Sequence, residues 1–258
     1  MEAAIGTIET SKLEKVVLAR AVDIEFPEAI DPRLVAARLI DLSANRDGFI
    51  ADLSPAGRPG AMLVGSSPEV LVKRQGSTVS AFPLAGSSPR RALAAEDHLA
   101  GQDLLHSSKD LHEHAFVVDH LRRALTPLCE RLDIPDVPQL ISTNEMWHLG
   151  TPISGTLKDK DLTALELALA VHPTPAICGT PAEAAQALIE TAETDRGFYA
   201  GAVGWCDSSG DGEYMVAIRC AEVAGDGLSA RAWAGGGIVG DSDAQAELEE
   251  TTAKLRTI

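Results

Sequence analysis

The segment that decides the fold begins at Lys15 and reads KVVLARAVDIEF. If the chain is extended here, one face carries only apolar residues apart from Arg20, and these are Val16, Leu18, Val22, Ile24 and Phe26. This period of two predicts a strand over residues 15–26. The opposite face places Lys15 beside small or apolar residues, which is an unusual setting for a charged side chain.

Working outward, patterns of the same kind predict strands at residues 61–64, 70–73, 198–206, 213–223 and 228–234. We expect the first two of these to pair through a turn at 65–69, and the glycines at 235–237 to form another tight turn. Helical spacing predicts helices after Ser107, at residues 161–171 and 181–192, and from Asp243 onward. Strands and helices are mixed without regular alternation, so we expect an α+β layered fold and a single domain over residues 1–258.

The composition excludes several classes of protein. The chain of 258 residues has 22 Lys and Arg against 38 Asp and Glu, a net charge of -16, which argues against nucleic acid or anionic membrane as a partner. No apolar run approaches the ~20 residues of a membrane span. The first residues lack the basic and apolar regions of an export signal, so we expect a cytoplasmic protein. The widely spaced cysteines then fit reduced thiols in the core; they are Cys129, Cys178, Cys206 and Cys220.

Two predicted helices offer pairs of carboxylates. Asp110 and Glu113 lie three residues apart and share a helix face, as do Glu247, Glu250 and Lys254. Together such pairs could form the all-oxygen site that magnesium prefers. The alternative is that they are solvated faces of surface helices, because these spacings are common.

Four further positions could contribute to a site. Lys15, held against apolar surface, could act as a base, or it could extend its ammonium to water from a strand end. Arg219 lies in an apolar predicted strand and needs a carboxylate partner from the protein or a ligand. Glu69 follows Pro68 and could be a partly buried acid. His148 is expected to be a buried, hydrogen-bonded histidine.

Nine short motifs follow one another along the chain in a specific order. They are KVVLAR at Lys15, GSSPEV at 65–70, PLAGS at 83–87, SSKDLHEH at 107–114, HPTPAICGTP at 172–181, YAGAVGWCD at 199–207, AIRCA at 217–221, AGGGI at 234–238 and ELEETTAKL at 247–255. This series resembles the chorismate-utilising enzymes, and most closely the isochorismate synthases of the siderophore-pathway type. The resemblance extends from Lys15 to Lys254.

The resemblance implies a reaction and its catalysts. Chorismate would be converted to isochorismate, with water attacking ring carbon two and the hydroxyl on carbon four departing. Lys15 would activate the water and Glu69 would protonate the departing hydroxyl. Glu113 and Glu250 would hold Mg2+ against the ring carboxylate of chorismate, while Asp110 and Glu247 would support the metal through water.

The resemblance also implies substrate contacts. The residues that would bind the carboxylates of chorismate or line its pocket are His148, Ala176, Tyr199, Arg219, Gly235, Gly236, Gly237 and Lys254. Ala85 stands where relatives that aminate covalently have a lysine, which argues against amination. Ala176 resembles the isochorismate synthases, whereas salicylate synthases tend to have a hydroxyl-bearing residue there.

Three alternatives stay open at this point: a salicylate synthase, an isochorismate synthase of the menaquinone pathway, and an inactive chorismate-binding remnant. The last is suggested by length, since enzymes of this family are usually longer and have an N-terminal portion that adds strands to the fold. We expect a monomer whose only partner is the small-molecule substrate.

Overall fold

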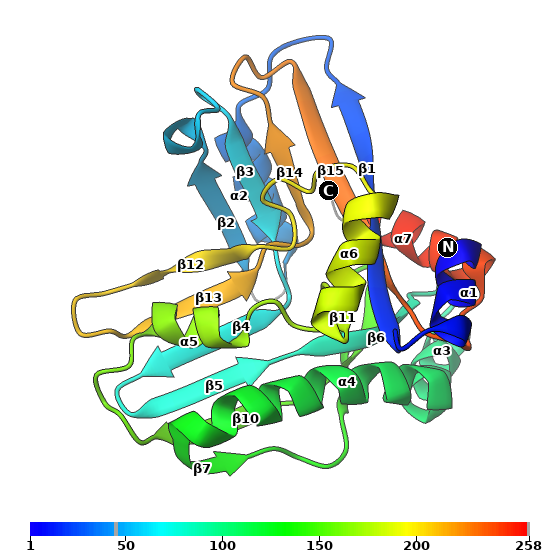
Figure 1. The fold of residues 1–258 in the computed structure, drawn as a ribbon. Coiled ribbons are helices and arrows are strands. Elements are labelled where there is room, and N and C mark those ends of the chain that lie inside the picture. The colour runs from blue at the N-terminus through cyan, green and yellow to red at the C-terminus, as the bar shows by residue number, and fades with distance from the viewer. Residues whose placement is uncertain (44–45, 257–258) are drawn as a thin grey trace.

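Two six-stranded sheets and one three-stranded sheet form the framework of the computed structural model, which describes residues 1–43 and 46–256 (Figure 1). The first sheet has the order β11–β1–β15–β14–β3–β2. Its strands are β11 (Gly179–Thr180), β1 (Lys15–Glu25), β15 (Ser229–Ile238), β14 (Cys220–Val223), β3 (Met62–Ser66) and β2 (Gly48–Asp52).

The second sheet has the order β12–β13–β4–β5–β10–β7, and the third has the order β6–β9–β8. Strands of the second sheet are β12 (Ala202–Cys206), β13 (Gly212–Val216), β4 (Val70–Gln75), β5 (Thr78–Phe82), β10 (Ile153–Leu157) and β7 (Cys129–Asp133). Those of the third are β6 (Leu84–Pro89), β9 (Met146–Gly150) and β8 (Gln139–Ser142). Every strand pair in the described part of the chain is antiparallel.

The strand predicted at Lys15 is confirmed as β1, which pairs with β15 from Val16 opposite Ile238 to Glu25 opposite Ser229. The prediction of a turn at residues 235–237 is wrong, because β15 runs straight through the three glycines. Each of them is paired in register with a residue of β1. Glycine inside a strand is typical of a close approach by another group, and the functional site shows which group that is.

Two other strand predictions need correction. β3 and β4 exist where the sequence predicts them but belong to different sheets, so residues 67–69 cross between the sheets and do not form a hairpin turn. The strand predicted at 213–223 is split into β13 and β14, and Arg219 in the interruption has a positive φ of 50°. That conformation is uncommon for a residue with a side chain, so the surrounding structure must hold it in place.

The predicted helices are confirmed, and side chains cap the starts of α4, α5 and α7. Ser107 accepts a hydrogen bond from the backbone of Asp110 at the start of α4, and Asp243 caps α7 in the same way. The helices are α1 (Glu2–Thr10), α2 (Pro32–Leu42), α3 (Ala94–His106), α4 (Ser108–Leu125), α5 (Ala164–Val171), α6 (Ala182–Ala192) and α7 (Ala244–Leu255), with short 3-10 turns η1 (Ser54–Ala56) and η2 (Thr126–Leu128). No helix of the described chain is long and apolar enough to cross a membrane.

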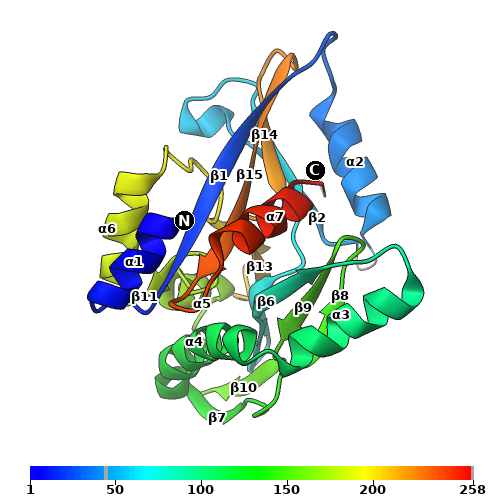
Figure 2. The same cartoon turned by 90° about the vertical axis from the view of Figure 1, so that its right-hand side faces the viewer.

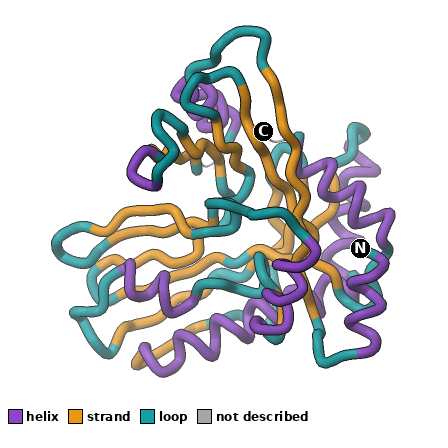
Figure 3. The backbone as a smooth tube through the Cα atoms, turned by 45° about the horizontal axis from the view of Figure 1, so that its top comes forward, coloured by secondary structure: helices purple, strands orange, loops and turns teal. Residues whose placement is uncertain are grey.

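The helices cover the outer faces of the sheets, which confirms the layered α+β fold. α7 crosses β15 and α6 packs on β1 (Figure 2). α3 packs on the third sheet, and α5 packs on β4 and β13. The backbone tube shows β1 and β15 running side by side (Figure 3).

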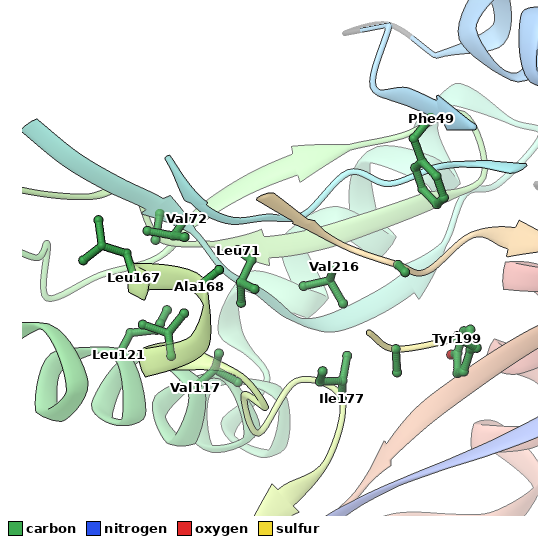
Figure 4. Packing of buried hydrophobic residues seen from close by; sticks show 14 of the residues in the cluster. Phe49, Leu71, Val72, Val117, Leu121, Leu167, Ala168, Ile177, Tyr199 and Val216 are labelled. Atoms are coloured by element: carbon green, nitrogen blue, oxygen red, sulfur yellow. The ribbon is translucent and has the colours of Figure 1, made fainter. Parts of the chain in front are cut away.

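The main core lies where α4, α5 and the second sheet meet. Leu121 from α4, Leu167 from α5 and Val72 from β4 point toward one another (Figure 4). All three are almost completely buried. The cluster continues to Phe49 and Trp233 of the first sheet, so one apolar region joins the two large sheets. Of the cysteines, Cys206 is exposed and the others are buried as free thiols.

We expect Leu167→Ala to lower the free energy of unfolding by about 2–5 kcal/mol, because truncation leaves a cavity in a packed core. Leu169→Ala is the matched control on the same helix, since Leu169 is 70% exposed and Leu167 is fully buried. Urea unfolding followed by circular dichroism measures both. Equal losses for the two variants would contradict this description of the core.

Candidate active site

A cleft between the end of the first sheet and the third sheet encloses about 700 Å³ of space, with the solvent at its mouth included. Ten of the residues predicted to act in catalysis, substrate binding or metal binding line it. They are Glu69, Glu113, His148, Ala176, Tyr199, Arg219, Gly235, Gly237, Glu250 and Lys254. Lys15, Asp110, Gly236 and Glu247 lie next to this cleft without lining it.

The glycines of β15 form one wall of the cleft. Gly235 accepts a hydrogen bond from Lys254 Nζ at 2.9 Å, so its backbone groups point away from β1. Successive residues of a strand direct these groups to opposite edges, so Gly236 faces β1 and Gly237 faces the same way as Gly235. Since β14 pairs with β15 only over residues 230–232, the backbone of Gly235 and Gly237 is left for other partners.

Carboxylates from α4 and α7 lie close to the backbone of these glycines. A Cβ atom on Gly237 would collide with Glu113 Oε1, and one on Gly236 would lie 3.0 Å from Glu247 Oε2. A Cβ on Gly235 would lie 3.1 Å from the hydroxyl of Tyr199. The run of glycines is therefore required by side chains that approach from α4, α7 and the loop of Tyr199.

Lys15 is fully buried at the start of β1. Its Nζ lies 3.2 Å from Glu113 Oε1, close enough for an ion pair. The geometry does not make a hydrogen bond, and Nζ has no other hydrogen-bond partner among the described residues. Because a buried donor without an acceptor is costly, this nitrogen is suited to bind a water molecule or a ligand oxygen.

Glu69 lies at the crossing from β3 to β4 and is 3% exposed. Burial raises its pKa from 4.5 to about 7, although the backbone amide of Leu84 and the positive charge of Lys15 oppose the rise. A carboxyl group with such a pKa is partly protonated at neutral pH, so it can donate a proton there.

Arg219 and His148 form a buried pair, with the arginine Nη2 3.5 Å from the histidine Nε2. Burial lowers the pKa of Arg219, and the negative charges that face it, Glu69 and Glu250 among them, oppose that change. Burial holds the pKa of His148 well below its usual value, and the charges of Arg219 and Lys254 lower it further. The pair therefore offers one positive charge and a neutral imidazole to the cleft.

Aromatic and small residues close the remaining side. Tyr199 stacks on Trp233 with ring centres 5.9 Å apart. Both rings line the cleft beside Ala176 and Ile177. Burial raises the pKa of Tyr199 above its usual value, so its hydroxyl is a neutral donor.

The four carboxylates of the predicted metal site lie on α4 and α7. Glu250 accepts hydrogen bonds from Ser87 Oγ at 2.8 Å and Lys254 Nζ at 2.5 Å. Burial works to raise the pKa of Glu250, but Lys254 and Ser87 outweigh it and the pKa is lowered. Burial and the neighbouring charge of Glu250 raise the pKa of Glu247, and burial likewise raises that of Asp110.

The donor set fits magnesium, a hard cation that is usually held by one or two carboxylates together with water and ligand oxygens. Glu113 and Glu250 both line the cleft, and glycine in β15 makes room for the Glu113 carboxylate. Within the described residues, no group of three or more His, Cys, Asp or Glu side chains is arranged so that it could hold a metal ion. The ion would therefore depend on oxygens from water or substrate.

Several residues that shape the cleft were not predicted from the sequence. Ser87 holds Glu250, and Lys109 Nζ lies 2.6 Å from Glu247 Oε1. His114 donates from Nδ1 to the carbonyl oxygen of Ala85 and accepts from Thr151 at Nε2, and Ala85 lines the cleft. The motif SSKDLHEH contains two of these residues, but only the packing of α4 reveals what they contact.

As a whole, the cleft combines positive groups for carboxylates with a buried amine and a buried carboxyl group for proton transfer. Such an arrangement suits an anionic small molecule whose reaction needs a base and an acid.

The sequence profile of the family described as "Chorismate binding enzyme" matches residues 1–258. The Mycobacterium tuberculosis protein assigned as isochorismate synthase MenF is 52% identical over 95% of this chain and 67% of its own length. Isochorismate synthase DhbC of Bacillus subtilis is 45% identical over 100% of this chain and 65% of its own length.

A solved structure shows the same fold. The protein assigned as the 2,3-dihydroxybenzoate-specific isochorismate synthase DhbC of Bacillus anthracis superposes with a TM-score of 0.95 at 42% identity, covering 99% of this chain and 68% of that one. The chain thus spans about two thirds of the length of the relatives it matches.

We expect Glu69→Gln to stabilise the protein at pH 8 but not at pH 4.5. The unfolded carboxyl group ionises near 4.5 and the folded one near 7, so wild-type stability falls as the pH rises between these values. At ~1.4 kcal/mol per pKa unit, the relative gain of the variant at pH 8 is about 3 kcal/mol.

Urea unfolding of both proteins at the two pH values measures this gain. Glu183→Gln, on the exposed start of α6, is the matched control. A stability difference between Glu69→Gln and wild type that is the same at both pH values would refute the raised pKa.

Proposed function

The chain belongs to the chorismate-binding enzyme family, and from this we propose that it is a magnesium-dependent isochorismate synthase. The observation that supports the chemistry best is Lys15, a fully buried amine that lacks a hydrogen-bond acceptor within the described chain and lies beside the cleft. Two relatives that are 52% and 45% identical are assigned as isochorismate synthases, which supports the same reaction.

In the proposed reaction, water attacks ring carbon two of chorismate and the hydroxyl on carbon four departs. To act as the base, Lys15 must first release its ammonium proton to solvent, and its Nζ then accepts a proton from the attacking water. Protonated Glu69 donates its proton to the departing hydroxyl, which leaves as a second water molecule. The proton gained by Lys15 and the proton lost by Glu69 balance, and exchange with solvent restores both groups.

The remaining cleft residues would hold the two carboxylates of the substrate. Arg219 and Lys254 supply positive charge, and the backbone amides of Gly235 and Gly237 supply donors for the enolpyruvyl carboxylate. Glu113 and Glu250 would hold magnesium, which supplies positive charge for the ring carboxylate. A protein with a net charge of -16 needs such local positive groups to bind a dicarboxylate.

We further propose that the product enters siderophore synthesis. The support is the similarity to DhbC of Bacillus subtilis and to the Bacillus anthracis protein assigned as specific for 2,3-dihydroxybenzoate. The menaquinone pathway is the alternative. Disruption of the gene should block growth under iron limitation, and added dihydroxybenzoate should restore it; rescue by menaquinone alone would contradict the siderophore assignment.

Incubation with chorismate and magnesium, followed by chromatographic separation of products, tests the reaction. We expect isochorismate alone. Salicylate with pyruvate would indicate a salicylate synthase, and binding of chorismate without turnover would indicate an inactive remnant.

We expect Lys15→Ala to lower kcat at least about 100-fold while chorismate binding remains measurable, because the loss of a general base costs about 10²–10⁴-fold. Lys12→Ala, on the exposed segment just before β1, is the control and should keep full activity. Unchanged turnover in Lys15→Ala would remove Lys15 as the base.

A further inference from the structure

Lys109 joins the two helices that carry the carboxylates of the cleft. Its Nζ lies 2.6 Å from Glu247 Oε1, which makes a charged hydrogen bond between α4 and α7. Glu247 is 2% exposed, while the Lys109 side chain is 27% exposed and does not line the cleft. Lys109 is therefore poorly placed to contact a substrate but well placed to fix Glu247.

The position of this ion pair along the two helices lets it influence the carboxylates that line the cleft. Lys109 precedes Glu113 by four residues, and Glu247 precedes Glu250 by three, so each partner is one helical turn before a carboxylate that lines the cleft. A contact that fixes Lys109 to Glu247 fixes the separation of the helices there. It therefore also constrains the separation of Glu113 and Glu250.

Glu247 is held from a third element as well. Ser242 Oγ donates to Glu247 Oε1 at 3.0 Å and accepts from the backbone N–H of Val239 at 3.1 Å, which ties the carboxylate to the end of β15. The other carboxylate oxygen faces Gly236. Two donors on one oxygen thus set the orientation of the whole group.

The cluster also needs a positive charge at this point. Asp110, Glu113, Glu247 and Glu250 repel one another, and each of the last three has a lysine partner, namely Lys15 for Glu113, Lys109 for Glu247 and Lys254 for Glu250. Lys15 and Lys254 have assigned roles in the reaction proposed above, toward water and substrate. Of the three lysines, Lys109 is the one whose ion pair with its carboxylate can persist through the whole proposed reaction.

We propose that Lys109 is a positioning residue whose ion pair with Glu247 sets the separation of Glu113 and Glu250 before magnesium binds. This inference rests on the proposed magnesium-dependent function. Preorganised ligands bind a metal more tightly because less order has to be created on binding.

Titration of the purified chain with magnesium chloride in a calorimeter tests the proposal without measuring activity. Lys109→Met should weaken magnesium binding about 10-fold to 100-fold, as is usual for loss of a partner that orients a metal ligand. Lys109→Arg, which keeps the charge and the donor, should stay within about threefold of wild type. Lys73→Met is the matched control, because Lys73 pairs with Glu213 on the second sheet, away from the cleft.

Kinetics separate positioning from direct catalysis. At saturating magnesium, kcat of Lys109→Met should recover to within about threefold of wild type, while the magnesium concentration for half-maximal rate stays raised. Should Lys109→Met fail to fold, Lys109→Gln takes its place, and circular dichroism checks each variant.

Two outcomes would overturn the proposal in distinguishable ways. Wild-type protein that takes up no magnesium overturns the metal assignment, and the role of Lys109 with it. Wild-type protein that binds magnesium, with Lys109→Met binding it equally well or weakened no more than Lys73→Met, overturns only the role of Lys109.

Discussion

The contact of Glu113 with the bare backbone of Gly237 is the constraint on which the rest of the site depends. A side chain at Gly237 would collide with the carboxylate and would also lie 3.2 Å from Cε of Lys15. Buried charges are tolerated only when they are paired, so Glu113 and Lys15 must meet there. Because Gly237 has no side chain, α4, β1 and β15 can meet at this point.

This contact explains how a strongly acidic protein can hold an anionic substrate. Most of the 38 acidic residues that give the net charge of -16 have no part in the cleft. In or beside it, lysines on β1 and α7 each lie next to a glutamate, and Arg219 adds a further positive charge. The local charge is nearly balanced, so the proposed cation and dicarboxylate would enter together at lower cost than either alone.

Sequence periodicity predicted which segments form strands and helices better than it predicted which strands pair, and the reason is physical. The apolar faces of β1 and α4 are local properties, so both elements were found with nearly correct bounds. Strand pairing depends on distant segments, and the crossing at residues 67–69 was predicted as part of a hairpin for that reason. The break at Arg219 was missed because nothing local favours a positive φ at an arginine. It is the sheet crossing and this break that bring Glu69 and Arg219 to the cleft.

The glycines of β15 show where sequence reasoning about a site reaches its limit. Glycine serves equally well in a turn and beneath a closely packed group, so the run at 235–237 could not distinguish the two locally. The deciding neighbour, Glu113, is more than a hundred residues away in the chain. The same holds for Lys109, whose partner Glu247 becomes visible only when α4 and α7 are packed together. Residue types thus indicate which chemistry a site can perform. Which of these residues contact one another is decided only when the helices and the sheet pack together.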